Sequence, residues 1–333
     1  MRKSVSVLLF SLAKAAITIT LIAIIVAKID FSALARHLGG TDTSYLVLGT
    51  LLLIANVPLV AGRWWLLLRR LDAGNISLGY AVAATFASVF VSQATPGPIG
   101  ADALRGWLCY RRGIAMRLAV MSLITDRLLA LLGLVAVAGA VWCWQFNAVD
   151  PTLGREIAIL GAVVLAGTAA ALWLSPALAD FLARRSPRFH RLQQLPAIFR
   201  FTALSGAGAA GLALGAIVIT LTINAVILFA RGLGVTLAPS AAYLIVPIAI
   251  LSSSLPISIG GWGVREASLS YGLTLLGVPT DDAALLGLAL GIGLLVASLP
   301  GGIVMLLLGT KARPALPDAA EPGLADGAPA NQS

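Results

Sequence analysis

Two short stretches decide the fold: residues 96–105, PGPIGADALR, and residues 256–266, PISIGGWGVRE. Each lies between apolar segments, because residues 78–95 and 240–255 precede the breaks and about 101–110 and 264–277 follow them. Proline lacks the amide donor that an α-helix needs and glycine loosens the backbone, so each stretch predicts a broken helix. Each half of such a pair is too short to cross a bilayer comfortably.

The two breaks share one spacing: a proline is followed by glycine at +4, a small residue at +5 and arginine at +9. The members are Pro96, Gly100, Ala101 and Arg105 in the first break and Pro256, Gly260, Gly261 and Arg265 in the second. The prolines lie 160 residues apart, about half the chain. This register predicts an internal repeat, with halves at about 1–144 and 155–308.

The composition around the breaks is that of a membrane protein. Of 333 residues, 59% are hydrophobic and 11% are charged, whereas a soluble domain carries about 25% charged residues. This balance excludes a soluble globular enzyme, a disordered protein and a nucleic-acid binder. Six other apolar segments are long enough to span a bilayer. They are about 5–27, 44–68, 116–143, 155–175, 203–230 and 283–308.

The first of these segments also resembles a signal peptide, because Arg2 and Lys3 precede it. Its 23 apolar residues favour an uncleaved spanning helix. The chain has two cysteines and two histidines, too few for a disulfide framework or a His- or Cys-rich metal site. We therefore predict no metal and no other cofactor, and the sequence has no P-loop motif that would indicate ATP as the energy source.

The 23 cations predict the topology. If the amino terminus is cytoplasmic and each broken pair is a re-entrant hairpin, 14 cations face the cytoplasm, four face outward and five lie within apolar segments. Cytoplasmic loops collect Lys and Arg, so this bias favours six full spans plus two hairpins that enter from opposite sides, an inverted-topology repeat. The cytoplasmic cations are Arg2, Lys3, Arg69, Arg70, Arg111, Arg112, Arg117, Arg184, Arg185, Arg188, Arg191, Arg200, Lys311 and Arg313.

The predicted domain organisation is a single all-α transmembrane domain over residues 1–310. A basic cytoplasmic connector at 176–201 alternates arginines with apolar residues, and is either a solvated loop or an amphipathic segment on anionic lipid. Residues 311–333 have no hydrophobic pattern and are expected to form a disordered cytoplasmic tail.

Several polar and small residues inside the spans have structural interpretations. We expect Asn56 and Asn224 to form interhelical hydrogen bonds. Arg63 and Trp64 fit an aromatic belt with a snorkelling arginine near the cytoplasmic side. Pairs of glycines four residues apart predict close helix packing. These pairs are Gly211 with Gly215 and Gly287 with Gly291.

The remaining intramembrane charges are either structural ion pairs that lock the hairpins to the spans or functional residues, because burying a charge in a bilayer is costly. Asp102 and Arg105 share a helix face, whereas Asp126 and Arg127 are adjacent and must have different partners. The return leg of each hairpin begins near its break, where free amides and a positive dipole end beside an arginine form an anion site. The predicted phosphate ligands are Arg105, Arg265, Gly100, Gly260 and Gly261, with Asp102, Asp126, Arg127 and Glu266 as pairing or relay groups and Pro96 and Pro256 as hinges.

These motifs resemble those of the lysylphosphatidylglycerol synthase transmembrane-region family, also called flippase-like proteins. Residues 96–105 resemble its P-G-x-x-G-G-D-x-x-R motif, although Ala101 replaces the second glycine and makes the first site less certain than the second. Residues 126–127 resemble its D-R pair, residues 256–266 its P-x-x-x-G-G-x-G-x-R-E motif, and residues 63–64 an R-W in its second span. The resemblance covers about residues 5–308.

The resemblance implies a multi-pass protein of the bacterial cytoplasmic membrane, with both termini in the cytoplasm, that moves lipids between leaflets. The implied partners are a membrane phospholipid or a polyprenyl- or hopanoid-type lipid, together with lipid-synthesis enzymes. Some relatives carry an aminoacyl-transferase domain after the membrane part. Only about 25 residues follow the last predicted span here, so we expect no synthase activity from this chain.

Three functions stay open at this level. The first is a translocase for an anionic, phosphate-bearing lipid, with no covalent chemistry. The second is a membrane enzyme such as a transferase, in which Asp102, Asp126 and Glu266 act as acid and base. The third is an accessory protein of lipid or lipid-linked glycan synthesis.

Overall fold

The chain is an assembly of helices, seen in a computed structural model that describes residues 42–73, 76–95, 98–144, 195–255 and 258–308, with isolated positions between 155 and 177. All regular elements in these ranges are helical. Some predicted features lie outside the described residues: the span at 5–27, most of the span at 155–175, the connector up to residue 194, the tail at 311–333, and Pro96 and Pro256.

Four long helices form the frame of the molecule: α3 (Thr43–Arg70), α6 (Met116–Trp144), α9 (Gly206–Gly232) and α12 (Thr280–Leu308). Each is apolar enough to cross a membrane, and 27 to 29 residues extend for about 40 Å at 1.5 Å per residue. Four of the six predicted spans are therefore confirmed as spanning-length helices. The chain is a multi-pass membrane protein.

Two pairs of short helices pack against this frame, and they confirm that the sequence is broken where the prolines and glycines predict. The first pair is α4 (Leu78–Ser92) and α5 (Ile99–Tyr110), and the second is α10 (Pro239–Ser253) and α11 (Val264–Leu275). Helices of 15 and 12 residues extend for only about 22 and 18 Å, less than the roughly 30 Å of a bilayer core.

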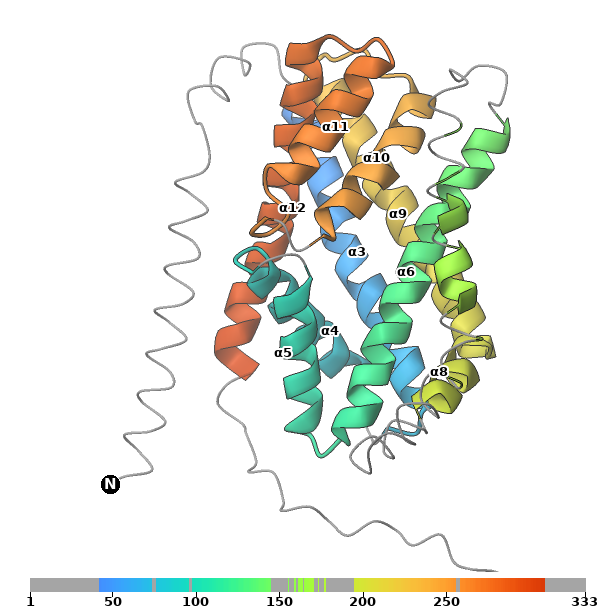
Figure 1. Ribbon diagram of the computed structural model, residues 1–333. Helices are drawn as coiled ribbons and strands as arrows, with labels where there is room; N and C mark the ends of the chain where they lie inside the picture. Colours follow the sequence, from blue (N-terminus) through green and yellow to red (C-terminus); the bar gives the residue numbers. More distant parts are fainter. Residues whose placement is uncertain are drawn as a thin grey trace, which may run out of the picture.

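Each short pair is a helical hairpin. The Arg112 guanidinium, just after α5, lies 3.9 Å from the ring centroid of Tyr80, in the first turn of α4, so the first hairpin begins and ends at the same end of the bundle. Figure 1 shows α4 and α5 in the lower half of the bundle and α10 and α11 in the upper half.

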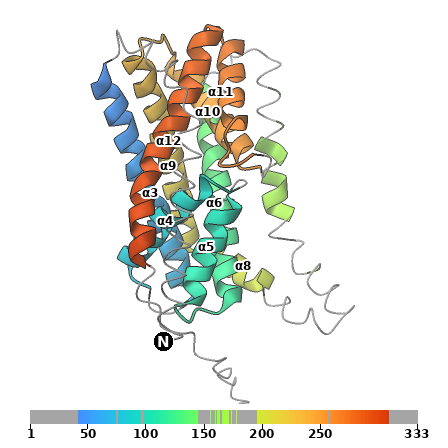
Figure 2. The ribbon, with the colours of Figure 1, turned by 90° about the vertical axis from the view of Figure 1, so that its left-hand side faces the viewer.

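The tips of the two hairpins meet near the middle of the bundle, as the two perpendicular views in Figures 1 and 2 show. The amide of Gly260 donates a hydrogen bond to the carbonyl of Thr95 at 2.9 Å. Gly260 has φ of +62°, and an added Cβ there would lie 2.7 Å from the carbonyl oxygen of Gln93. A glycine is needed at this position because both the backbone conformation and the neighbouring chain exclude a side chain.

Polar side chains and small residues hold the long helices together. The Asn56 amide on α3 donates to the Thr222 hydroxyl on α9 at 3.0 Å, and the Asn224 amide donates to the Tyr243 hydroxyl on α10 at 3.0 Å. Both asparagines thus form the expected interhelical hydrogen bonds. Packing is close where Gly133 of α6 crosses α9, because a Cβ on Gly133 would lie 2.7 Å from the Ala216 amide nitrogen.

A short helix, α8 (Leu195–Ala203), precedes α9 at one end of the bundle. It begins inside the predicted connector, so the end of that segment is helical, and Pro196 stands in its first turn, where proline is tolerated. Ser205 separates α8 from α9 and caps α9, since its hydroxyl accepts a hydrogen bond from the Gly208 amide at 3.2 Å.

Candidate functional site

Three helices bring five charged side chains into one network, which we call the arginine network: Arg63 of α3, Asp102 and Arg105 of α5, and Asp126 and Arg127 of α6. Three cations and two anions leave a formal charge of +1 on this group. A net charge beside apolar helices needs a counter-ion or water, because an uncompensated buried charge is costly.

Asp126 is the buried centre of the arginine network. It is fully buried, and its carboxylate accepts from Arg63 Nε at 2.6 Å and from Arg105 Nη1 at 3.3 Å. Arg127, one position later, is rotated by about 100° around the helix. Its Nε and Nη2 both donate to Asp102, each at 2.8 Å. The adjacent residues therefore have different partners.

Asp102 joins the two sides of the arginine network. It lies in the first turn of α5, where a carboxylate is favoured by the helix dipole. Arg105, one turn later on the same face, donates from Nη2 to Asp102 at 2.6 Å. Asp102 thus accepts from Arg105 and Arg127 together, so an anion that approaches either arginine competes with this carboxylate.

Arg105 has spare donor capacity. The residue is 2% exposed, and in the described part of the chain its buried Nε atom has no hydrogen-bond partner. Its guanidinium carbon lies 5.2 Å from the ring centroid of Trp64, whose own Nε1 donates to the Ser122 hydroxyl at 3.1 Å. A buried donor without an acceptor is unusual and points to a missing anion or water.

The arginine network is closed on one side and open on the other. The side chains of Arg63, Arg105 and Asp126 are at most 4% exposed, whereas those of Asp102 and Arg127 are 25% and 39% exposed. The same two helices, α5 and α6, also carry exposed apolar residues. They are Ile99, Trp107, Val120 and Ile124, all at least 38% exposed.

The second hairpin carries a smaller, neutral group. Arg265 is 4% exposed, and its Nε and Nη2 donate to Glu266 at 3.1 and 2.5 Å. The other oxygen of Glu266 accepts from the Gly263 amide at 2.6 Å and so caps α11. Gly261 and Gly263 have φ of +73° and +84°, which favours glycine at both positions.

Two glycines of α12 make room for this pair. A Cβ on Gly291 would lie 2.6 Å from Glu266 Oε1 and 3.2 Å from Arg265 Nη2, and one on Gly287 would lie 3.0 Å from the Glu266 carbonyl. The predicted close packing at these glycines is thus against α11, and it sets the position of the charged side chains.

We expect Gly291→Ala to displace the Glu266 carboxylate, because the new methyl group would occupy its place, and to lower any activity that depends on Arg265. Gly62→Ala on α3 is the matched control, since nothing lies within 4 Å of a Cβ there. Thermal unfolding and activity are measured for both variants. Normal activity in Gly291→Ala would contradict a functional position for Glu266.

The interpretation of Arg63 as a snorkelling interface residue is wrong. Arg63 and Trp64 are 3% and 0% exposed, and Arg63 pairs with the most buried carboxylate of the arginine network. Arginine is rare inside a spanning helix. This rarity alone could have indicated that Arg63 belongs to a charge network, even with its partner unknown.

The predicted glycine ligands lie together where the two hairpin tips meet, and Gly100 and Gly260 both lie against Thr95. Gly100 is the second residue of α5, and a Cβ there would overlap the Thr95 side chain. Gly260 and Gly261 lie at the tip of the second hairpin. No ion pair or hydrogen bond joins the arginine network to Arg265 or Glu266 within the described residues.

Comparison with known proteins identifies a family. The family described as "Lysylphosphatidylglycerol synthase TM region" matches residues 11–305. This range includes both hairpins and all seven charged residues above. No curated protein matches the chain. Because the match covers most of the sequence, the chain belongs to the lysylphosphatidylglycerol synthase TM region family.

Proposed function

We propose that the protein is a translocase that moves an anionic, phosphate-bearing lipid across the bacterial cytoplasmic membrane. The observation that carries this proposal is the arginine network, which has a formal charge of +1 and a buried, unpartnered Nε on Arg105. Family membership supports a role in lipid synthesis or translocation. The proposed activity makes and breaks no covalent bond.

The headgroup phosphate takes the place of Asp102 as acceptor for Arg105 and Arg127. Both arginines already donate to this carboxylate, so the phosphate exchanges one set of charge-assisted hydrogen bonds for another of similar strength. Such an exchange avoids a large desolvation cost. It also keeps binding weak enough for release, because Asp102 competes for the same donors.

The lipid reaches the arginine network from the side. Asp102 and Arg127 are its exposed members, and the helices that carry them, α5 and α6, also have exposed apolar residues. The headgroup enters between these helices while the acyl chains stay against the exposed apolar residues. A polar route for the headgroup with the chains left in lipid lowers the barrier to crossing.

The second hairpin completes the route from the opposite side. We infer that both hairpins are re-entrant and related as an inverted repeat, which is a recurring plan in transporters with broken helices. The contact between Gly260 and Thr95 supports this inference, because the tips meet at mid-height (Figure 1). In this arrangement Arg265, held by Glu266, receives the phosphate after Arg105 releases it.

The test is translocation of fluorescent anionic lipids in liposomes that contain the purified protein. Arg105→Ala is expected to reduce the rate to that of protein-free liposomes, and Arg105→Lys to retain part of it, because lysine keeps the charge without the planar fork. Arg231→Ala, at the exposed end of α9, is the control and should match the wild type.

Two outcomes would refute the proposal. One is an unchanged rate for folded Arg105→Ala protein, checked by gel filtration and thermal unfolding. The other is a wild-type rate at the level of protein-free liposomes. Formation of a new lipid product by the purified protein would instead support the alternative of a membrane enzyme.

A further inference from the structure

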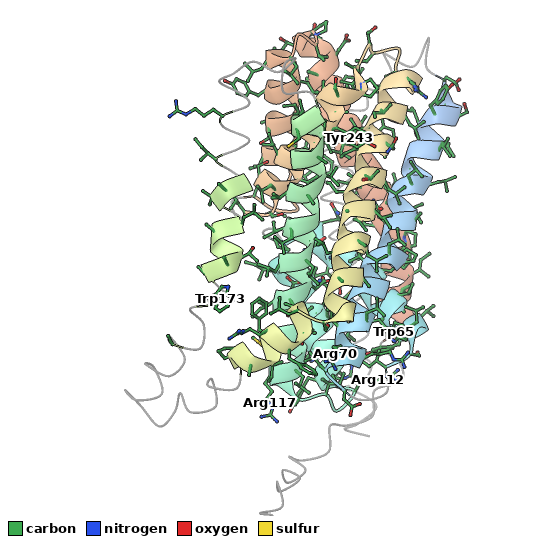
Figure 3. All side chains as sticks on the ribbon, turned by 90° about the vertical axis from the view of Figure 1, so that its right-hand side faces the viewer. Trp65, Arg70, Arg112, Arg117, Trp173 and Tyr243 are labelled. Carbon is green, nitrogen blue, oxygen red and sulfur yellow. The ribbon has the colours of Figure 1, made fainter. Side chains whose placement is uncertain are left out.

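One end of the bundle carries five arginines that each lie over an aromatic ring, and we call this the basic–aromatic end. The distances from the guanidinium carbon to the ring centroid range from 3.5 to 5.2 Å. Figure 3 shows Trp65, Arg70 and Arg112 gathered at this end, far from Tyr243. The five pairs are Arg70 with Phe201, Arg112 with Tyr80, Arg111 with Trp107, Arg69 with Trp65 and Arg200 with Trp173.

Two of these rings are themselves held in place. The Trp65 Nε1 donates to the Ile76 carbonyl at 2.8 Å, and the Tyr80 hydroxyl donates to the Leu108 carbonyl at 3.3 Å. Both rings also pack on the apolar cluster beneath this end. Arg69 and Arg112 therefore lie on fixed platforms, which reduces the conformational entropy lost when their N–H edges bind a ligand.

Among the described residues, no acidic side chain forms an ion pair with the arginines of the basic–aromatic end, although five other such pairs occur there. At the opposite end Asp42, Asp281 and Asp282 accompany Arg231, whereas the basic–aromatic end has Asp72 beside its five arginines. The charges are thus distributed asymmetrically along the bundle, with the cations concentrated at one end.

Apolar side chains accompany these cations. On α8, Phe199 is buried against the bundle while Phe201 is 52% exposed, and Leu204 beyond it is 69% exposed. Trp107 and Tyr110, at the end of α5, are 38% and 46% exposed. Exposed aromatic and apolar groups next to arginines are typical of the membrane–water boundary rather than of a surface in water.

We propose that the basic–aromatic end binds resident anionic phospholipids, whose phosphates accept hydrogen bonds from the stacked arginines while their chains contact Phe201 and Leu204. A guanidinium that lies flat on a ring keeps its N–H edge free for bidentate phosphate binding. These lipids stay on one leaflet and do not cross. The proposal is independent of translocation, since none of these arginines belongs to the arginine network.

The test compares lipid retention by purified wild-type and variant proteins in detergent. Each is incubated with phosphatidylcholine vesicles or with phosphatidylcholine vesicles that contain phosphatidylserine, and bound lipid is counted by native mass spectrometry. The triple variant Arg69→Gln/Arg111→Gln/Arg112→Gln should bind phosphatidylserine at least about tenfold more weakly, because each basic residue near an anionic surface contributes to binding.

The triple lysine variant at the same positions separates charge from geometry. It keeps the charge but loses the flat stacking, so it should bind phosphatidylserine more tightly than the glutamine variant and less tightly than the wild type. Retention of phosphatidylserine by the glutamine variant at the wild-type level would overturn the proposal. The proposal would also be overturned if inorganic phosphate raised the unfolding temperature of the wild type as much as phosphatidylserine does. The site would then not need a lipid.

Discussion

Replacing Asp126 with alanine is expected to destabilise the protein by about 3–5 kcal/mol, the usual cost of removing one member of a buried ion pair. Asp126 is fully buried and accepts from Arg63 and Arg105, which are themselves at most 3% exposed. Its loss leaves two buried guanidinium groups with one acceptor fewer. The change is measured as the shift in thermal or denaturant-induced unfolding in detergent.

A paired replacement shows whether charge is the cause. Arg63→Leu combined with Asp126→Leu removes one cation together with the anion, so it should lose less stability than Asp126→Ala alone. Asp281→Ala, at the exposed start of α12, is the control for removing a carboxylate and should cost less than about 1 kcal/mol. Equal stability of Asp126→Ala and the wild type would show that the ion pairs contribute nothing.

The second large effect is expected at Gly133, where α6 crosses α9. We expect Gly133→Ala to cost about 3 kcal/mol, the upper part of the usual range for overpacking. An added Cβ would lie 2.7 Å from both the Ala216 amide nitrogen and the Gly215 carbonyl carbon, and these are backbone atoms that cannot rotate away. The helices must therefore separate locally.

Gly139→Ala, on the same helix, is the matched control. Nothing lies within 4 Å of a Cβ at Gly139, so alanine there should stabilise the helix by up to about 1 kcal/mol through its better helix propensity. Unfolding of both variants under the same conditions gives the comparison. If the two alanines behaved alike, the contact between α6 and α9 would not be close in the membrane.

The main features of the described fold are predictable because they depend on local sequence. Apolar segments near 44–68 and 283–308 become long helices, since length and hydropathy alone determine whether a segment can span. The breaks near Gly100 and Gly260 follow from the backbone chemistry of proline and glycine. The sequence left the basic connector as either a solvated loop or an amphipathic segment, and it did not specify that a helix, α8, begins at Leu195 within it.

The candidate site is less predictable, because pairing depends on contacts between distant segments. The sequence identifies Asp126 and Arg127 as unusual and requires that they have different partners. It does not reveal that Asp126 pairs with Arg63, 63 positions away, or that Arg127 pairs with Asp102. Helical periodicity gives the face on which a residue lies, but not the helix that covers that face. For this reason Arg63 was assigned to the interface.

The hydrogen bond between Gly260 and Thr95 has a consequence for biosynthesis. The Thr95 carbonyl accepts from an amide that is synthesised 165 residues later. At about 5–20 residues per second, elongation over this distance takes roughly 8–33 s. In the re-entrant arrangement that we propose, the tip of the first hairpin has no final partner during this time, although an exposed peptide group in the hydrocarbon region is costly. The first half therefore inserts before it can reach its final structure, and a ribosome stalled before residue 260 would leave it incomplete.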